Sequence, residues 1–166
     1  MSNLELSPVV VDNLDWLPLA LPESEGIFIK VLRVDKASGR AVLKIKMAAN
    51  SAAPKHYHFC RAVAYTISGS WDYDEGGFQA GDVAVEPIGN FHQATSTNGT
   101  EMMLVFDTHF SDGRLLDNYM SDGSVVRIGI QLLQQLEAKN LSEMLDFNPM
   151  PYIQIFPNVA AAEAQR

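Results

Sequence analysis

Two histidines separated by a single residue are the first side chains in this sequence that could do chemistry. His56 and His58 flank Tyr57, and in a β-strand residues i and i+2 point to the same side, about 7 Å apart along the chain. Two imidazoles on one face can bind a metal ion from one direction. Because His-x-His pairs also occur as unrelated exposed residues, a third ligand is needed to make this pair a site.

A second segment, residues 81–92, offers a third ligand. A strand-like run ends at Pro87, which cannot donate a hydrogen bond to a sheet, and Gly89 follows where the chain can turn sharply. The turn would direct His92 back toward the first two histidines. The pair and His92 together form the predicted metal site.

The spacing of these residues resembles the cupin superfamily. The second cupin motif is Gly, five residues, Pro-x-Gly, two residues and His; the segment from Gly81 matches every fixed position up to His92, and Ser96 replaces the trailing Asn. Gly69 follows the His-x-His pair at about the distance found in the first motif. The resemblance implies an all-β cupin fold, a jelly-roll-like barrel (double-stranded β-helix) of two short sheets.

A closer resemblance is to cupin dioxygenases that cleave small carbonyl compounds, of the 2,4'-dihydroxyacetophenone dioxygenase and acetylacetone-cleaving type. It runs through Leu14–Leu19, Ala64–Trp71 and Glu86–Gly89 and spans about two thirds of the chain. It implies a small carbonyl substrate, O₂ as co-substrate and a homodimer. The iron-binding histidines of those enzymes carry over to His56, His58 and His92.

The carboxylate ligand of most cupins is missing from its usual place. That glutamate lies four or five residues after the second histidine, where this chain has Ala62 or Val63. Three neutral imidazoles would leave the full charge of a divalent ion, and open coordination positions, available to a chelating substrate. Imidazole also accepts Zn and Ni, so the preference for Fe(II) rests on the resemblance alone.

Two further side chains are candidate catalytic residues. Glu86 shares a strand face with Ala84, and in cupins that face looks into the barrel. Glu86 is therefore a candidate fourth ligand, hydrogen-bond partner of a ligating histidine, or base, with an exposed strand end as the alternative. Tyr65 shares a face with Val63 and Ile67; it is a candidate pocket residue, and a buried core tyrosine is the more ordinary interpretation.

Three other reactive side chains receive simpler interpretations. Arg61 and Cys60 follow His58 closely enough to contact a substrate or the metal, but a solvated charge and a small packing residue are favoured for them. His109 lies beyond the two motifs, and its strand parity with the site is not defined by the sequence. We assign His109 a structural or indirect role.

Short strands separated by turns account for most of the chain before residue 110. The expected strands are 27–34, 43–47, 63–67, 71–73, 82–86 and 102–108. Many short strands at close spacing predict a barrel or sandwich, whose core we place at about 26–110. Apolar residues at helical spacing between Ile130 and Leu145 predict a short helical part at about 125–146, and the tail 160–166 has no clear pattern.

Composition limits the function classes. The chain has 166 residues, 47% of them hydrophobic and 19% charged, so we expect one folded domain, 1–166, and no disordered repeat. Its net charge of −8, with scattered Lys and Arg, disfavours nucleic acid and anionic membranes as partners. The first residues do not read as a signal peptide and Cys60 is the single cysteine, so we expect a cytoplasmic protein.

Two functions of different classes remain open at this point. The first is an Fe(II)-dependent dioxygenase that binds a small ketone, diketone or hydroxyketone and cleaves a carbon–carbon bond with O₂. The second is a non-catalytic Zn-binding cupin similar to the sensor domain of some anti-sigma factors. A metal-dependent isomerase or hydrolase would act without O₂.

Overall fold

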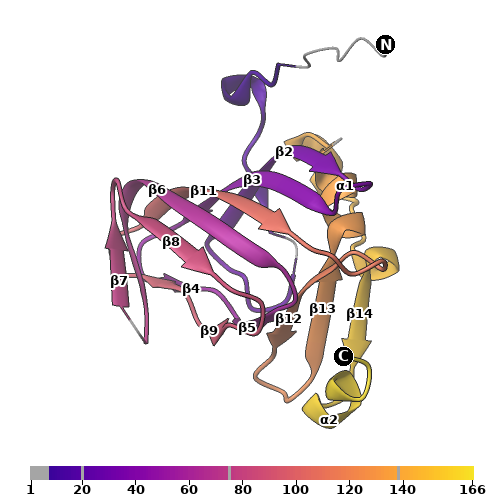
Figure 1. The fold of residues 1–166 in the computed structure, drawn as a ribbon. Coiled ribbons are helices and arrows are strands. Elements are labelled where there is room, and N and C mark those ends of the chain that lie inside the picture. The colour runs from indigo at the N-terminus through magenta and orange to yellow at the C-terminus, as the bar shows by residue number, and fades with distance from the viewer. Residues whose placement is uncertain (1–7, 20, 75, 138) are drawn as a thin grey trace.

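The computed structural model describes residues 8–19, 21–74, 76–137 and 139–166. Two antiparallel sheets face one another across an apolar interior and curl into a barrel (Figure 1). The predicted all-β barrel of two sheets with a short C-terminal helical segment is confirmed.

The larger sheet carries most of the strands expected from the sequence. Its order is β1-β2-β3-β11-β6-β10-β4, and β7 and β8 also pair with β6. The strands are β1 (Leu17–Pro18), β2 (Ile27–Asp35), β3 (Arg40–Met47), β4 (Ser51–Ala52), β6 (Arg61–Tyr73), β7 (Gly76–Gln79), β8 (Val83–Glu86), β10 (Thr95–Ser96) and β11 (Thr100–Asp107).

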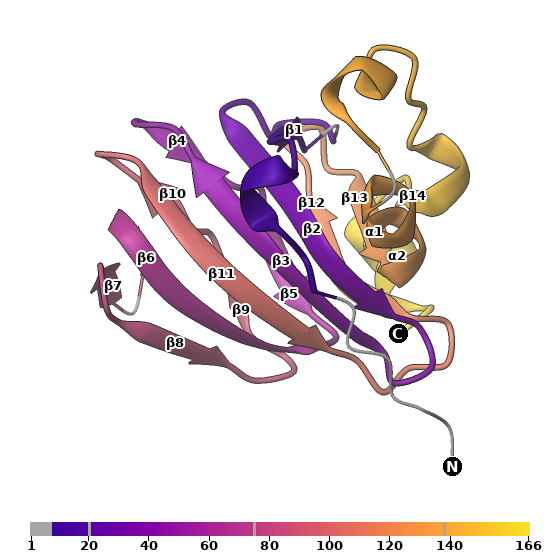
Figure 2. The same ribbon diagram turned by 90° about the horizontal axis from the view of Figure 1, so that it is seen from above.

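The smaller sheet has the order β14-β13-β12-β5-β9. Its strands are β5 (Lys55–His58), β9 (Phe91–His92), β12 (Arg114–Tyr119), β13 (Val125–Gly129) and β14 (Ile153–Phe156). The helices are α1 (Ile130–Glu137), α2 (Val159–Glu163) and the 3-10 turns η1 (Val11–Asn13), η2 (Leu141–Met144) and η3 (Met150–Tyr152). Figure 2 shows α1 and α2 beside β13 and β14, at the far side of the barrel from β7 and β8.

Strand β6 shows how the residue pattern defines an inner and an outer face. Ala62, Ala64 and Thr66 are fully buried, whereas Val63 and Tyr65 are exposed. Alternate residues of a strand lie on opposite faces, so the small side chains of β6 face the interior. They leave room inside the barrel.

Gly69 allows β6 to approach the end of β11 closely. Its φ is +72°, and a Cβ at this position would lie 2.0 Å from the carbonyl oxygen of Gly99. The register between β6 and β11 shifts nearby, between Glu101 and Met102. A larger residue would therefore be both strained and in steric conflict with the backbone.

The predicted end of the barrel at residue 110 is wrong. Strands β12 and β13 belong to the smaller sheet, and helix α1 begins at Ile130, later than the predicted 125. Their outer faces carry Asp117 and Arg127, which are buried as an ion pair at 2.7 Å. Two charged residues inside short strands concealed the strand pattern.

The C-terminal tail forms helix α2, although its sequence has no clear pattern. Arg127 donates hydrogen bonds to the carbonyl oxygens of Ala162 at 3.2 Å and Gln165 at 3.1 Å. The Asn158 side chain accepts a hydrogen bond from the Ala161 amide and caps the start of the helix. Contacts from β13, far away in the sequence, thus order the tail.

Within the described residues, no helix has both the length and the apolar character that crossing a membrane requires.

Candidate metal centre

Strand β5 places two imidazoles inside the barrel. His56 and His58 are buried, and the intervening Tyr57 is only half-buried on the other face. β5 lies between β12 and β9 in the smaller sheet, so both neighbours hold it in register. The i, i+2 spacing therefore acts as predicted, by placing both rings on the inner face.

His92 reaches the pair through a tight turn and a short strand. β9 is antiparallel to β5, and His92 lies directly opposite His56. The amide of Gly89 donates to the carbonyl of His58, and the amide of His58 donates to the carbonyl of Asn90, both at 2.9 Å. Gly89 has φ +90°, a conformation that favours glycine, and this turn links the position of His92 to that of His58.

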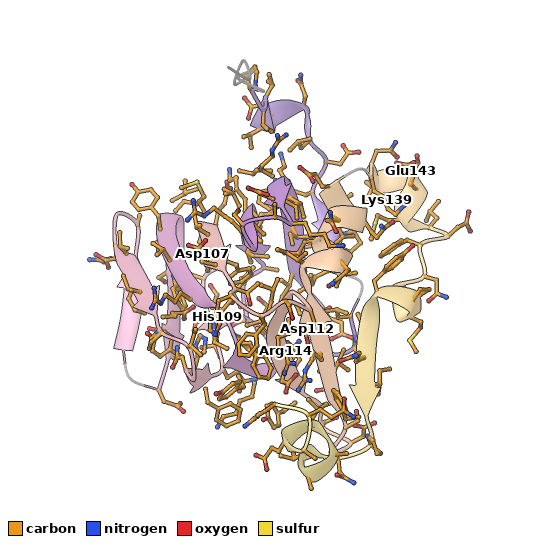
Figure 3. All side chains as sticks on the ribbon, turned by 45° about the vertical axis from the view of Figure 1, so that its right-hand side comes forward. Asp107, His109, Asp112, Arg114, Lys139 and Glu143 are labelled. Atoms are coloured by element: carbon orange, nitrogen blue, oxygen red, sulfur yellow. The ribbon has the colours of Figure 1, made fainter. Side chains whose placement is uncertain are left out.

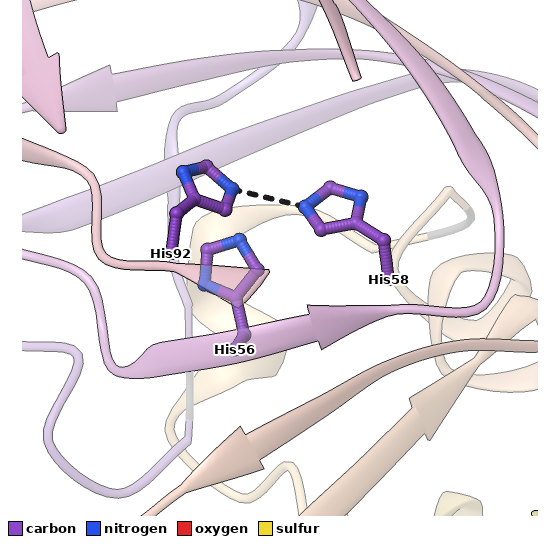
Figure 4. A group of neighbouring side chains, drawn as sticks. All are labelled: His56, His58 and His92. Carbon is purple, nitrogen blue, oxygen red and sulfur yellow. Dashed lines mark hydrogen bonds between the residues drawn. The ribbon is translucent and has the colours of Figure 1, made fainter. Parts of the chain in front are cut away.

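The three imidazoles converge on one point (Figure 4). One ring nitrogen from each lies within 4.8 Å of the others, and the Nε2 atoms of His58 and His92 are 3.0 Å apart. The Nδ1 of His56 lies 2.8 Å from the carbonyl oxygen of Pro54. Because a carbonyl only accepts, this contact places the His56 proton on Nδ1 and leaves the Nε2 lone pair free as a ligand.

Burial keeps these imidazoles neutral. Burial and the neighbouring histidines lower the pKa of His58 to about 2, and burial together with His56 lowers that of His92 to about 3. The pKa of His56 is also lowered by burial. Metal ions bind the neutral form of imidazole, so the donor set suits a divalent metal ion.

Glu86 lies beside the histidines on the opposite sheet. Its carboxylate is 4% exposed, with Oε1 3.2 Å from Nε2 of His92 and Oε2 3.7 Å from Nε2 of His58. Burial raises its pKa to about 7. The carboxylate therefore points into the barrel, as its parity with Ala84 predicts, and its catalytic role stays a prediction.

Glu86 is also the direct cross-strand partner of Ala62. Ala62 is one of the two positions at which the usual cupin glutamate would fall, and it faces the interior. The carboxylate beside this site thus comes from β8 in place of β6. The sequence signal for it was the buried parity of Glu86 in a four-residue strand.

Tyr65 does not line the site, and its candidate role in the pocket is wrong. Its side chain is 42% exposed on the outer face of β6, opposite Val83 and Met103. The parity that groups it with Val63 and Ile67 is correct, but that face points away from the barrel. The inner face carries alanines because the cavity occupies the space beside them.

The other reactive side chains lie outside the site. Cys60 is completely buried in the core, and burial, followed by the charge of Glu86, raises the pKa of its thiol. Arg61 is exposed at the start of β6. His109 is exposed after β11 and stacks on Phe110, in the surface segment that also carries Asp112 and Arg114 (Figure 3).

A family model of the ChrR cupin-like domain matches residues 7–111, more than half of the chain. The chain belongs to the ChrR cupin-like domain family. Among curated proteins, no sequence matches it. The residues matched by the family model include both histidine segments and end before β12.

Solved structures with the same fold include dioxygenases. A candidate acetylacetone dioxygenase from Methylibium petroleiphilum PM1 superposes with TM-score 0.69 and 23% identity, covering 84% of this chain and 99% of that chain. For the acetylacetone dioxygenase from Acinetobacter johnsonii, the TM-score is 0.65 and the identity 18%, with 80% and 90% covered. The predicted similarity to cupins of this type is confirmed at the level of fold.

The complex of Rhodobacter sphaeroides SigE with the anti-sigma ChrR contains a weaker match. Its TM-score is 0.51 at 15% identity, covering 58% of this chain and 51% of that chain. The fold of this cupin is therefore shared by enzymes and by a protein that binds a sigma factor.

Proposed function

We propose that this cupin is a non-haem Fe(II)-dependent dioxygenase that cleaves a carbon–carbon bond in a small ketone, diketone or hydroxyketone. The observation that carries the proposal is the convergence of three neutral imidazoles at an apolar cavity, with one buried carboxylate beside them. Three protein ligands leave coordination positions open for substrate and O₂.

In this proposal the three histidines hold the metal ion in a fixed orientation, and Glu86 accepts and releases the substrate proton. The contact of His56 with Pro54 fixes one ring, and the β5–β9 pairing fixes His92 opposite it. With its pKa near 7, Glu86 can accept a proton from the carbon next to a substrate carbonyl and release it again. A bound Fe(II) would supply O₂ activation and a Lewis acid for the enolate.

The metal is the part of the proposal that most needs measurement. His56, His58 and His92 would hold Fe(II), and the same ligands accept Zn or Ni. We propose Fe(II) because the fold is shared with acetylacetone dioxygenases. The partners are then a small carbonyl compound and O₂.

Metal analysis followed by oxygen-electrode assays tests the proposal. Protein purified without added metal is analysed for Fe, Zn and Ni, stripped, reloaded with Fe(II) and supplied with acetylacetone or 2,4'-dihydroxyacetophenone. We expect substrate-dependent O₂ uptake and cleavage products in equal amounts. Bound Fe(II) without substrate-dependent O₂ uptake on any ketone, diketone or hydroxyketone tested would count against dioxygenase chemistry.

The second candidate function is a Zn-binding sensor domain, and the ChrR cupin-like family match favours it. A sensor predicts stoichiometric zinc after purification and no O₂ uptake after Fe(II) loading. Glu86, directly opposite Ala62, places a carboxylate beside the three histidines, so the protein offers the four ligands of a closed zinc site as well. The same two measurements therefore separate the enzyme from the sensor.

A further inference from the structure

The cavity beside the histidines is walled by hydrocarbon. It has a volume of about 120 Å³, and its walls come from both sheets, from Leu19 and Leu21 between β1 and β2, and from Leu133 of α1. Most other lining side chains are aliphatic or aromatic, including Trp71 and Phe106. Among the described lining residues, none is Lys, Arg or Asp.

Two polar lining groups outside the cluster of histidines and Glu86 make hydrogen bonds within the protein. The Ser24 hydroxyl donates to the carbonyl oxygens of Leu19 and Leu21, at 3.0 and 2.6 Å. The amide of Asn118, which lies directly opposite His56, donates to the carbonyl of Val126 at 3.1 Å. A phosphate or carboxylate group of a ligand would therefore lose its water without gaining a charged partner.

We propose that the cavity selects a small, neutral ligand with an apolar carbon skeleton, such as a short-chain ketone, and rejects carboxylates and sugars. The inference rests on the proposed function in taking a carbonyl compound as the ligand, while the hydrocarbon wall is independent of the reaction. Its volume equals that of about four waters at ~30 Å³ each.

Binding to metal-free protein tests the ligand class without any turnover. The chain has two tryptophans, and Trp71 lines the cavity whereas Trp16 lies over Lys30, Lys44 and Lys46. In a Trp16→Phe variant, the remaining emission reports on the cavity. The probes are 2-pentanone, 2-hexanone, 2-heptanone and hexanoate, which differs from 2-heptanone only by a carboxylate oxygen in place of a methyl group.

We expect saturable changes in emission, and affinity that rises about fourfold with each methylene of the ketones. Hexanoate at pH 8 should bind at least 100-fold more weakly than 2-heptanone. Equal affinity for hexanoate and 2-heptanone, or emission that does not respond to saturating ketone, would overturn the proposal. A protein that binds ketones but shows no O₂ uptake would contradict only the proposed function.

A matched pair of variants locates the binding in the cavity. Ala64 and Ala84 are direct cross-strand partners in the buried core, but only Ala64 lines the cavity. Ala64→Val should weaken 2-heptanone binding about tenfold, and Ala84→Val should change it less than twofold. Leu133→Ala should strengthen binding of the longer ketones. Equal effects of the two alanine variants would place the ligand elsewhere.

Discussion

The position of one carboxylate distinguishes this site from the usual cupin arrangement. Glu86 lies on β8, directly opposite Ala62 on β6, where the family glutamate would fall. A cross-strand partner has its Cβ about 5 Å away on the same face, so the negative charge remains in the cavity. It approaches the histidines from a neighbouring strand.

Removing any one of the three imidazoles is the simplest test of the metal site. We expect His56→Ala, His58→Ala and His92→Ala each to lose stoichiometric metal while remaining folded, because the core consists of apolar strands. Metal content and circular dichroism measure both outcomes. His109→Ala is the control, since His109 is exposed and far from the cavity lining. If one of these three variants keeps stoichiometric metal, the histidine replaced in that variant is not a ligand.

Glu86→Gln tests the carboxylate in two ways. Proton transfer by a positioned base contributes about 10²-fold or more to rate, so turnover should fall by that factor while fold and metal are retained. Metal affinity supplies a second readout. Because burial raises the pKa of Glu86 to about 7, its negative charge develops as pH rises through 7, and affinity for a divalent ion should rise with it.

The histidines do not titrate in that window, because burial lowers the pKa of His58 and His92 to about 2 and 3. In Glu86→Gln, metal affinity between pH 6 and 8 should therefore be flat. Titration calorimetry at several pH values gives the comparison. A rise that persists in the variant would assign the pH dependence to another group.

On strand β6, the grouping of residues by face was predictable, but which of the two faces points into the barrel was not. The sequence groups Tyr65 with Val63 and Ile67 correctly, but the aromatic residue faces out and the alanines face in. Large apolar residues usually mark the buried face. Here the buried face borders a cavity and the exposed face carries an apolar patch, so both usual signals are reversed.

Among the elements, the turn between β8 and β9 positions His92, the third candidate ligand. Gly89→Ala places a side chain at φ +90°, which costs about 1–2 kcal/mol, and displaces the turn that is hydrogen-bonded to His58. We expect lower stability and at least tenfold weaker metal binding. Urea unfolding and metal titration measure the two effects.

Gly123→Ala is the matched control for that turn. Gly123 has φ +85° with open space around it, between β12 and β13. The Gly123→Ala variant should lose a similar amount of stability and keep its metal affinity. If both glycine variants weaken metal binding equally, strain in general, and not the His92 turn, would be responsible.

Element prediction succeeded where one face of a strand contacts water. β2, β3, β8 and β11 match the expected segments within a few residues because their patterns alternate or run apolar between turns. β12 and β13 were missed because helix α2 covers their outer faces. Asp117 and Arg127 are hidden there as a pair, and no local pattern predicts that cover.

At the scale of the whole molecule, the Asp117–Arg127 pair attaches the tail to the barrel. Breaking a buried pair leaves an uncompensated charge and costs about 3–5 kcal/mol. We expect Arg127→Met to lower the free energy of unfolding by about that amount and to increase hydrogen exchange in α2. Arg40→Met, which breaks the exposed pair with Asp107, should cost less than about 1 kcal/mol. If Arg127→Met lowers the free energy of unfolding as little as Arg40→Met does, other contacts hold α2 on the barrel.

The location of the site on two sheets has a mechanical consequence. All three imidazoles stand on β5 and β9 of the smaller sheet, and the Glu86 carboxylate stands on β8 of the larger one. A change in the spacing between the two sheets would therefore alter the distance from the carboxylate to the histidines and leave the distances among the three imidazoles unchanged. The packing between the sheets thus sets where the carboxylate lies relative to the histidines.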